Sequence, residues 1–109
     1  MASGTLGISN PSANTWTTVY QVPTGKVSTV NIRVTNTSSS TGCALRLAIG
    51  AANGAPPSIA EYIEQIDYIM EAGEVLEDYA VVIGDGDKVK IFVSTANIAV
   101  RIHGFEANQ

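Results

Sequence analysis

Two neighbouring segments of this chain place apolar side chains at every second position, and this alternation limits the fold more than any other feature of the sequence. Because successive side chains of a β-strand point to opposite faces of its sheet, a period of two predicts strands with one buried and one exposed face. Polar residues 37–42 separate the two segments and predict a loop. The alternating apolar residues are Val30, Ile32 and Val34 in the first segment and Cys43, Leu45, Leu47 and Ile49 in the second.

The composition agrees with a core built from aliphatic side chains. Hydrophobic residues make up 45% of the 109 residues but aromatic residues only 6%, so Val, Ile, Leu and Ala must fill most of the interior. A chain of this length forms one domain with one core. Cys43 is the single cysteine, which excludes an intramolecular disulfide and a zinc site of several thiolates, and we expect it to be a small buried residue.

Turn-forming residues divide the rest of the chain into further short strands. Residues 1–14 are rich in Gly, Ser and Asn, which predicts a flexible N-terminal arm with a short edge strand around residues 5–8. The turn at residues 23–26 predicts a hairpin, and residues 95–97 predict another one near the end of the chain. We expect strands at residues 15–22, 27–36, 43–49, 62–70, 74–83, 89–94 and 98–105.

Residues 58–70 give conflicting signals. Apolar side chains recur there at helical spacing, and Ser58 and Glu61 match a capping box, so this segment alone predicts a helix. Its many Ile and Tyr residues and the strands around it favour an extended chain instead. We expect one helical turn at residues 58–61 and a strand over 62–70, with a helix over residues 59–71 as the alternative.

Short strands and frequent turns together predict an all-β fold, either an antiparallel β-sandwich of seven to eight strands or a small barrel. Residues 15–109 are expected to form its single domain. No apolar run approaches the roughly 20 residues that cross a bilayer, and residues 1–5 lack the features of a secretory signal. We therefore expect no membrane partner and no cleaved signal.

Charge is distributed unevenly along the chain. Residues 1–60 contain three bases and no acid, which gives +3, whereas residues 61–109 contain ten acids and three bases, which gives −7. If the two halves lie apart in the fold, the basic side of one copy would face the acidic side of another and favour assembly. If strands of the two halves alternate in space, the asymmetry averages out. An acidic chain without clustered Lys and Arg is not expected to bind nucleic acid.

No group of residues predicts a catalytic, cofactor or metal site. His103 is the only histidine, a pair with Cys43 has no supporting motif, and we expect His103 to be structural or exposed to solvent. Seven acids within residues 61–78 are spread as on a solvated face rather than paired as in a glycosidase. Asp85 and Asp87 lack the longer ligand series of a calcium loop and predict a tight turn.

Carbohydrate binding by a lectin-like fold is an alternative that the exposed Thr and Ser residues of several strands suggest. No cluster of Trp and Tyr in the sequence supports it, and we expect Trp16 to lie in the core.

Several segments, taken in order, resemble a family of small structural proteins of tailed bacteriophages. The likeness covers residues 15–106, and it implies a strand at residues 62–70 and a jelly-roll-like sandwich. The chain departs from the family at residues 65–67 and 70–71, where a shorter connection is expected. The matching segments are VYQVPTGK at residues 19–26, VNIRVTN at 30–36, LRLAI at 45–49, EYIE at 61–64, GEVLE at 73–77, GDKV at 86–89 and NIAVRIHGFE at 97–106.

The resemblance implies a non-enzymatic virion protein, assembled in the host cytoplasm. Its expected role is capsid decoration, as a cement protein that binds the phage major capsid protein and its own copies and stabilises the head. A homo-oligomer is expected, with a trimer as the first guess by analogy. The alternative is a component of the tail, baseplate or a fibre, with carbohydrate binding as one form of it. Residues 1–14 would then serve as an arm that reaches a neighbour.

Overall fold

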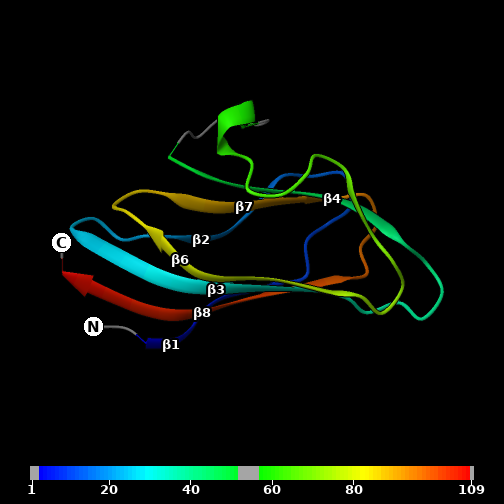
Figure 1. Cartoon of the computed structure of the whole chain (residues 1–109), viewed down its shortest axis with the longest axis horizontal. Helices are drawn as coiled ribbons and strands as arrows, with labels where there is room; N and C mark the ends of the chain where they lie inside the picture. The colour runs from blue at the N-terminus through cyan, green and yellow to red at the C-terminus, as the bar shows by residue number, and fades with distance from the viewer. Residues whose placement is uncertain (1–2, 52–56, 109) are drawn as a thin grey trace.

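The computed structural model of this chain describes residues 3–51 and 57–108 and consists of two antiparallel four-stranded sheets packed face to face (Figure 1). This architecture confirms the predicted all-β sandwich and excludes the small barrel. The strands are β1 (Ser3–Ser9), β2 (Thr17–Gln21), β3 (Lys26–Asn36), β4 (Cys43–Gly50), β5 (Tyr68–Met70), β6 (Val75–Ile83), β7 (Lys88–Val93) and β8 (Ile98–Asn108), and a short 3-10 helix, η1 (Ile59–Glu61), precedes β5.

The strands follow the order of a jelly roll. The first sheet has the order β1-β8-β3-β6 and the second sheet the order β2-β7-β4-β5. Each strand of the N-terminal half pairs with its counterpart counted from the C-terminus: β1 with β8, β2 with β7, β3 with β6 and β4 with β5. The chain is thus a doubled ribbon that rolls up into two sheets. The jelly-roll-like sandwich that the resemblance implied is confirmed.

The core lies between the two sheets and uses the residues that the alternation predicted. Val30, Ile32 and Val34 of β3 are at most 1% exposed, and Leu45 and Leu47 of β4 are fully buried. Facing strands add further aliphatic side chains, and Tyr20 is the one aromatic residue of the buried core cluster among the described residues. These additional core residues include Met70, Val89, Ile91, Val93, Ile98, Val100 and Ile102.

Both predicted hairpins are wrong. β2 and β3 lie in different sheets, and so do β7 and β8, although a short connection joins each pair. Alternation identifies the buried face of a strand but not its neighbour, and crossing to the facing sheet buries the same residues as a hairpin. The connection after β7 is held by Asn10, whose Nδ2 donates to the carbonyl oxygens of Ala96 at 2.8 Å and Ile98 at 2.7 Å.

The segment 58–71 contains the predicted helical turn but only a short strand. At η1 the Glu61 carboxylate accepts the Ser58 N–H at 3.1 Å, as a capping box requires. The prediction of a strand over residues 62–70 is wrong, and so is the alternative helix, because β5 extends only over Tyr68–Met70. The chain before β5 instead lies along the edge of β4 with which β5 also pairs, where Tyr62 makes an isolated bridge to Ala48 and the N–H of Ile63 donates to the carbonyl oxygen of Leu47 at 3.0 Å.

The N-terminal residues are more ordered than the arm that the sequence predicted. The expected edge strand is present and longer, because β1 pairs with β8 from Ser3 to Ser9. Residues 3–9 therefore belong to the first sheet and do not form an arm beyond it.

Each of the four edge strands is either interrupted or short. β1 and β2 carry β-bulges at Leu6 and Val19, where the pairing register shifts by one residue. In β6 two residues, Tyr79 and Ala80, lie opposite Asn31, and Ala80 adopts the left-handed conformation with φ 54°. The fourth edge strand, β5, has only three residues.

Candidate functional site

The outer face of the first sheet gathers basic side chains at its centre. Cross-strand register places Arg101 of β8 between Ile8 of β1 and Arg33 of β3, and all three point away from the core. His103 and Phe105 follow on the same face of β8. We call these five residues the basic face. Ile8 is 66% exposed and Phe105 47% exposed, so the basic centre lies among accessible apolar side chains.

The two arginines of the basic face differ in their partners. Arg33 forms an ion pair with Glu77 of β6 at 3.2 Å. Arg101 donates to Nε2 of His103 and to Oγ1 of Thr5, each at 3.1 Å, and no carboxylate among the described residues lies within ion-pair distance of it. The basic face therefore carries positive charge that its own neighbours do not neutralise.

The outer face of the second sheet carries an aromatic cluster. Trp16, just before β2, packs edge-on against Tyr62 with ring centroids 6.0 Å apart and against Phe92 of β7 at 5.6 Å. All three rings are half-buried. The prediction of Trp16 as a core residue is therefore wrong, because its ring lies on the outer face of the second sheet, against the rings of Tyr62 and Phe92.

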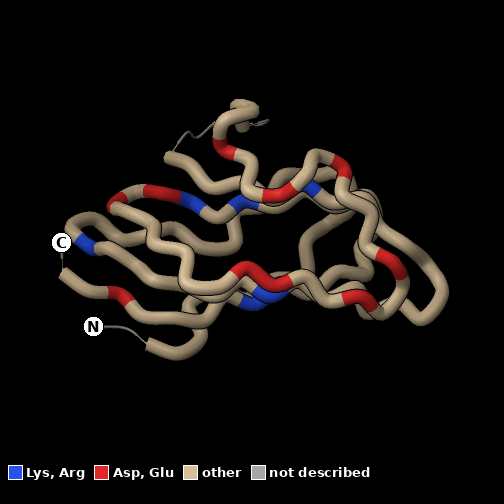
Figure 2. Tube along the Cα trace, viewed as in Figure 1, with Lys and Arg blue, Asp and Glu red and all other residues tan. Residues whose placement is uncertain are grey.

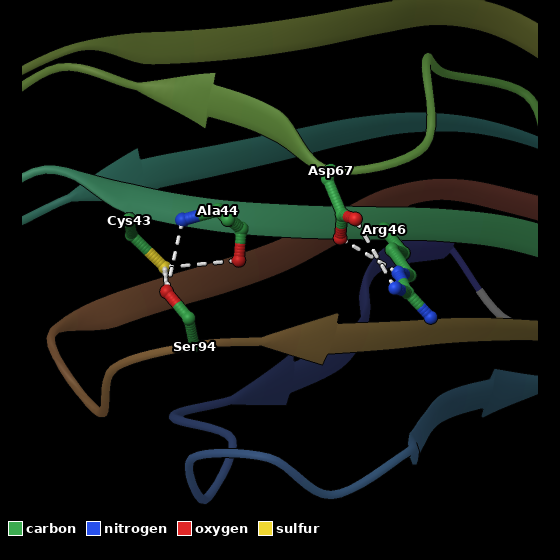
Figure 3. A network of polar contacts seen from close by, with 5 residues as sticks. All are labelled: Cys43, Ala44, Arg46, Asp67 and Ser94. Atoms are coloured by element: carbon green, nitrogen blue, oxygen red, sulfur yellow. Dashed lines mark hydrogen bonds and ion pairs between the residues drawn. The ribbon is translucent and has the colours of Figure 1, made fainter.

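Arg46 and Asp67 flank the aromatic cluster. The Arg46 guanidinium lies 5.3 Å from the centre of the Phe92 ring, and it donates to both carboxylate oxygens of Asp67 at 2.7 Å and 3.1 Å (Figure 3). Hydrogen bonding to Arg46 lowers the pKa of Asp67, and the same contact raises the pKa of Arg46. This pair presents adjacent charged donors and acceptors beside partly exposed rings.

Glu61 fixes η1 to the second sheet through a buried ion pair. Lys90 of β7 is 4% exposed, and its Nζ lies 3.7 Å from Oε1 of Glu61. Gly50 makes room for this contact, because a Cβ at that position would lie 1.7 Å from Oε2 of Glu61. The absence of a side chain at Gly50 thus allows the carboxylate to lie against β4.

Exposed isoleucines and acids mark the segment from η1 to the turn after β5. The isoleucines are 81% (Ile59), 37% (Ile63), 41% (Ile66) and 58% (Ile69) exposed. We call residues 59–71 the acidic strip, because four acids and no base occur in it.

Glu64 of the acidic strip lies near a second carboxyl group, that of Asp78 in β6. Burial, and then hydrogen bonding and repulsion with Asp78, raise the pKa of Glu64. Oδ2 of Asp78 is buried without a hydrogen-bond partner in the described structure. Neither carboxyl group forms an ion pair among the described residues.

The bases and acids of the two halves of the chain lie side by side. The ion pairs Arg33–Glu77 and Arg46–Asp67 each join a base from residues 1–60 to an acid from residues 61–109. Both sheets contain strands from both halves, and positive and negative positions are interspersed in Figure 2. Of the two expectations for the charge asymmetry, the interleaved arrangement is confirmed and the separation of the halves is wrong.

The candidate catalytic residues do not come together. Cys43 is buried between the sheets, where Oγ of Ser94 donates to its Sγ at 3.7 Å (Figure 3), whereas His103 is exposed on the basic face. Asp85 and Asp87 form the predicted tight turn. Their carboxylates accept backbone N–H groups, that of Asp85 from Gly25 at 2.9 Å and that of Asp87 from within the turn at 3.1 Å.

No sequence pattern predicts the aromatic cluster. Trp16, Tyr62 and Phe92 are far apart in the chain, and no short motif links them. The outward position of Phe92 in β7 was visible in the alternation, but its neighbours follow from the sheet order and from the path of residues 62–66. Only a correct pairing of β4 with β7 would have brought Arg46 and Phe92 together.

No family model, no curated protein and no solved structure matches this chain. Within the described residues, no helix is long and apolar enough to span a membrane.

Proposed function

We propose that this protein is a non-enzymatic structural component of a tailed-phage virion, and that it decorates the capsid by binding the major capsid protein and its own copies. The observation that carries the proposal is the jelly-roll order of the strands, of which β2–β7 and most of β8 lie within residues 15–106, the segment that carries the resemblance to phage structural proteins. Viral capsid domains are among the proteins built on this fold, although fold alone does not determine function.

Further support comes from the two outer surfaces. Charged and apolar side chains lie exposed on the basic face and on the acidic strip, and exposed apolar groups rimmed by charge are typical of surfaces that contact other proteins. A decoration protein needs such contacts on more than one side, because it binds the shell and neighbouring copies together.

Mass spectrometry and electron microscopy of purified particles test the proposal. The protein is expected in particles of the phage that encodes it, as density on the outside of the head. Particles that lack this protein should lose DNA at a lower temperature than complete ones. Absence of the protein from purified particles would refute the proposal, and density confined to the tail would replace decoration by the tail or baseplate alternative.

The aromatic cluster favours a second candidate, a tail or fibre component that binds carbohydrate. Trp16 and Phe92 offer apolar ring surface, and Arg46 and Asp67 offer hydrogen-bonding groups beside it. A glycan array tests this candidate, with Trp16→Ala as the disabling variant. Phe105→Ala on the opposite sheet is the matched control. Binding that Trp16→Ala removes and the control keeps would support it, and an array without binding would reject it.

A further inference from the structure

Two surfaces of the sandwich each carry a charged side chain that forms no ion pair within the described residues, and these two charges are of opposite sign. On the first sheet, Arg101 has no carboxylate partner among the described residues. In the segment before β5, Glu64 likewise has no base within ion-pair distance among the described residues, and its neighbour is Asp78 of β6 in the first sheet. Each unpaired charge lies in a region that is only partly desolvated, so a residue from another molecule can reach it.

Both surfaces also expose aliphatic or aromatic side chains around the charge. The basic face presents Ile8 and Phe105, and the acidic strip presents four isoleucines, of which Ile69 on β5 points outward opposite Ala44. Burial of these groups gives an association free energy that does not depend on charge, and the charges then select the orientation.

We infer that the acidic strip of one copy docks on the basic face of a second copy. The two surfaces lie on opposite sheets of the sandwich, so the contact is heterologous and each copy uses a different side toward each neighbour. A heterologous contact repeats until it closes into a ring or extends as a row. The inference rests on the proposed function, because it names the surfaces through which a decoration protein would contact its own copies.

Arg101 and Glu64 provide the charge contact. An arginine from a neighbouring copy placed beside Glu64 would compensate the charge of its carboxylate and offset its repulsion with Asp78. Contact with the partner's Glu64 would likewise supply the carboxylate that Arg101 does not have. The charge of Arg101 on one copy thus complements the charge of Glu64 on the next copy.

Sedimentation velocity of the purified full chain tests the inference. The average mass should rise with protein concentration up to about 1 mM, and it should fall when salt is raised to about 1 M, where the Debye length is about 3 Å. Arg101→Glu should weaken the association at least about tenfold. Lys26→Glu is the matched control, because it changes the net charge equally at the far end of β3, and it should associate like the wild type.

Complementation of two disabled variants identifies the contact as heterologous. Arg101→Glu keeps an intact acidic strip, whereas Glu64→Gln/Ile66→Ser keeps an intact basic face. Glu64→Gln also removes the repulsion with Asp78, so this variant should fold, and its uncharged amide offers no cation to the glutamate of the other variant. Each variant alone should be monomeric, and an equimolar mixture should form a 1:1 complex that grows no further.

Several results would overturn the inference. These are a wild type that stays monomeric at every concentration, an Arg101→Glu variant that associates as strongly as the wild type, and a mixture of the two variants that remains monomeric. Failure here is distinct from failure of the proposed function. A monomer in solution that is found on phage heads would refute the contact alone, whereas the expected complexes together with absence from particles would refute only the virion role.

Discussion

Replacing Gly104 by Ala should destabilise the fold strongly, because this glycine lies where two central strands approach most closely. Gly104 of β8 pairs with Val30 of β3 on one side and with Gly4 of β1 on the other. A Cβ at this position would lie 2.0 Å from the carbonyl oxygen of Thr29 and 2.9 Å from the Cα of Val30. These are backbone atoms of a buried strand, so no side chain can rotate to make room.

The magnitude follows from the separation that the new methyl group requires. Moving the Cβ from 2.0 Å to ordinary contact with the Thr29 oxygen shifts β8 from β3 by more than about 1 Å, which breaks one or two ladder hydrogen bonds. Each buried backbone group left unpaired costs about 1–3 kcal/mol, for a total of about 2–5 kcal/mol. For a domain of this length, that loss lowers the melting temperature by about 8–20 °C.

Thermal and urea unfolding, followed by circular dichroism, provide the measurement. Gly84→Ala is the matched control, because the atom nearest to its new Cβ is Oδ2 of Asp87 at 3.8 Å, an ordinary contact. The control should change the free energy of unfolding by no more than about 1 kcal/mol. If Gly104→Ala unfolds within about 0.5 kcal/mol of the wild type, the close approach of β8 and β3 is wrong.

Three further substitutions test other contacts. Ala80→Gly removes the left-handed strain at φ 54° and should raise the free energy of unfolding by about 0.5–1 kcal/mol in urea; no gain would contradict the bulge. Burial and Asp78 raise the pKa of Glu64, so the free energy of unfolding of the wild type falls as pH rises through the folded pKa of this group. Glu64→Gln should therefore be more stable than the wild type at about pH 7, and this advantage should vanish below about pH 4. Burial and Glu106 raise the pKa of Tyr20 to about 12, so the wild type should lose stability relative to Tyr20→Phe between about pH 10 and 12. Identical pH profiles for a variant and the wild type would contradict the corresponding contact.

The local pattern of the sequence was sufficient for the strands but not for their arrangement. The period of two in β3 and β4 identified the buried residues correctly, because a side chain's face depends only on its own strand. The predicted hairpins were wrong because pairing depends on distant strands, and adjacent strands of this chain cross between the sheets in most cases. Resemblance, rather than periodicity, suggested the rolled topology.

The segment before β5 shows why helical spacing can mislead. Its isoleucines recur every three or four residues, yet they are exposed, and the buried contacts of the segment come from Tyr62 and Glu61 instead. Both anchors depend on partners elsewhere in the chain, namely Trp16 and Lys90. No analysis of residues 58–70 alone reveals these partners, so neither the short strand nor the aromatic cluster was accessible from the sequence.

The irregular edge strands have a consequence at high protein concentration. An open sheet edge offers unpaired N–H and C=O groups to any other strand, and regular edges therefore join into continuous sheets and fibres. No edge of this sandwich presents a regular run of such groups, because three edge strands carry bulges, at Leu6, Val19 and Ala80, and the fourth, β5, is short. Crowded copies can then meet only through side chains, which keeps their contacts specific and reversible and leaves each molecule a separate unit.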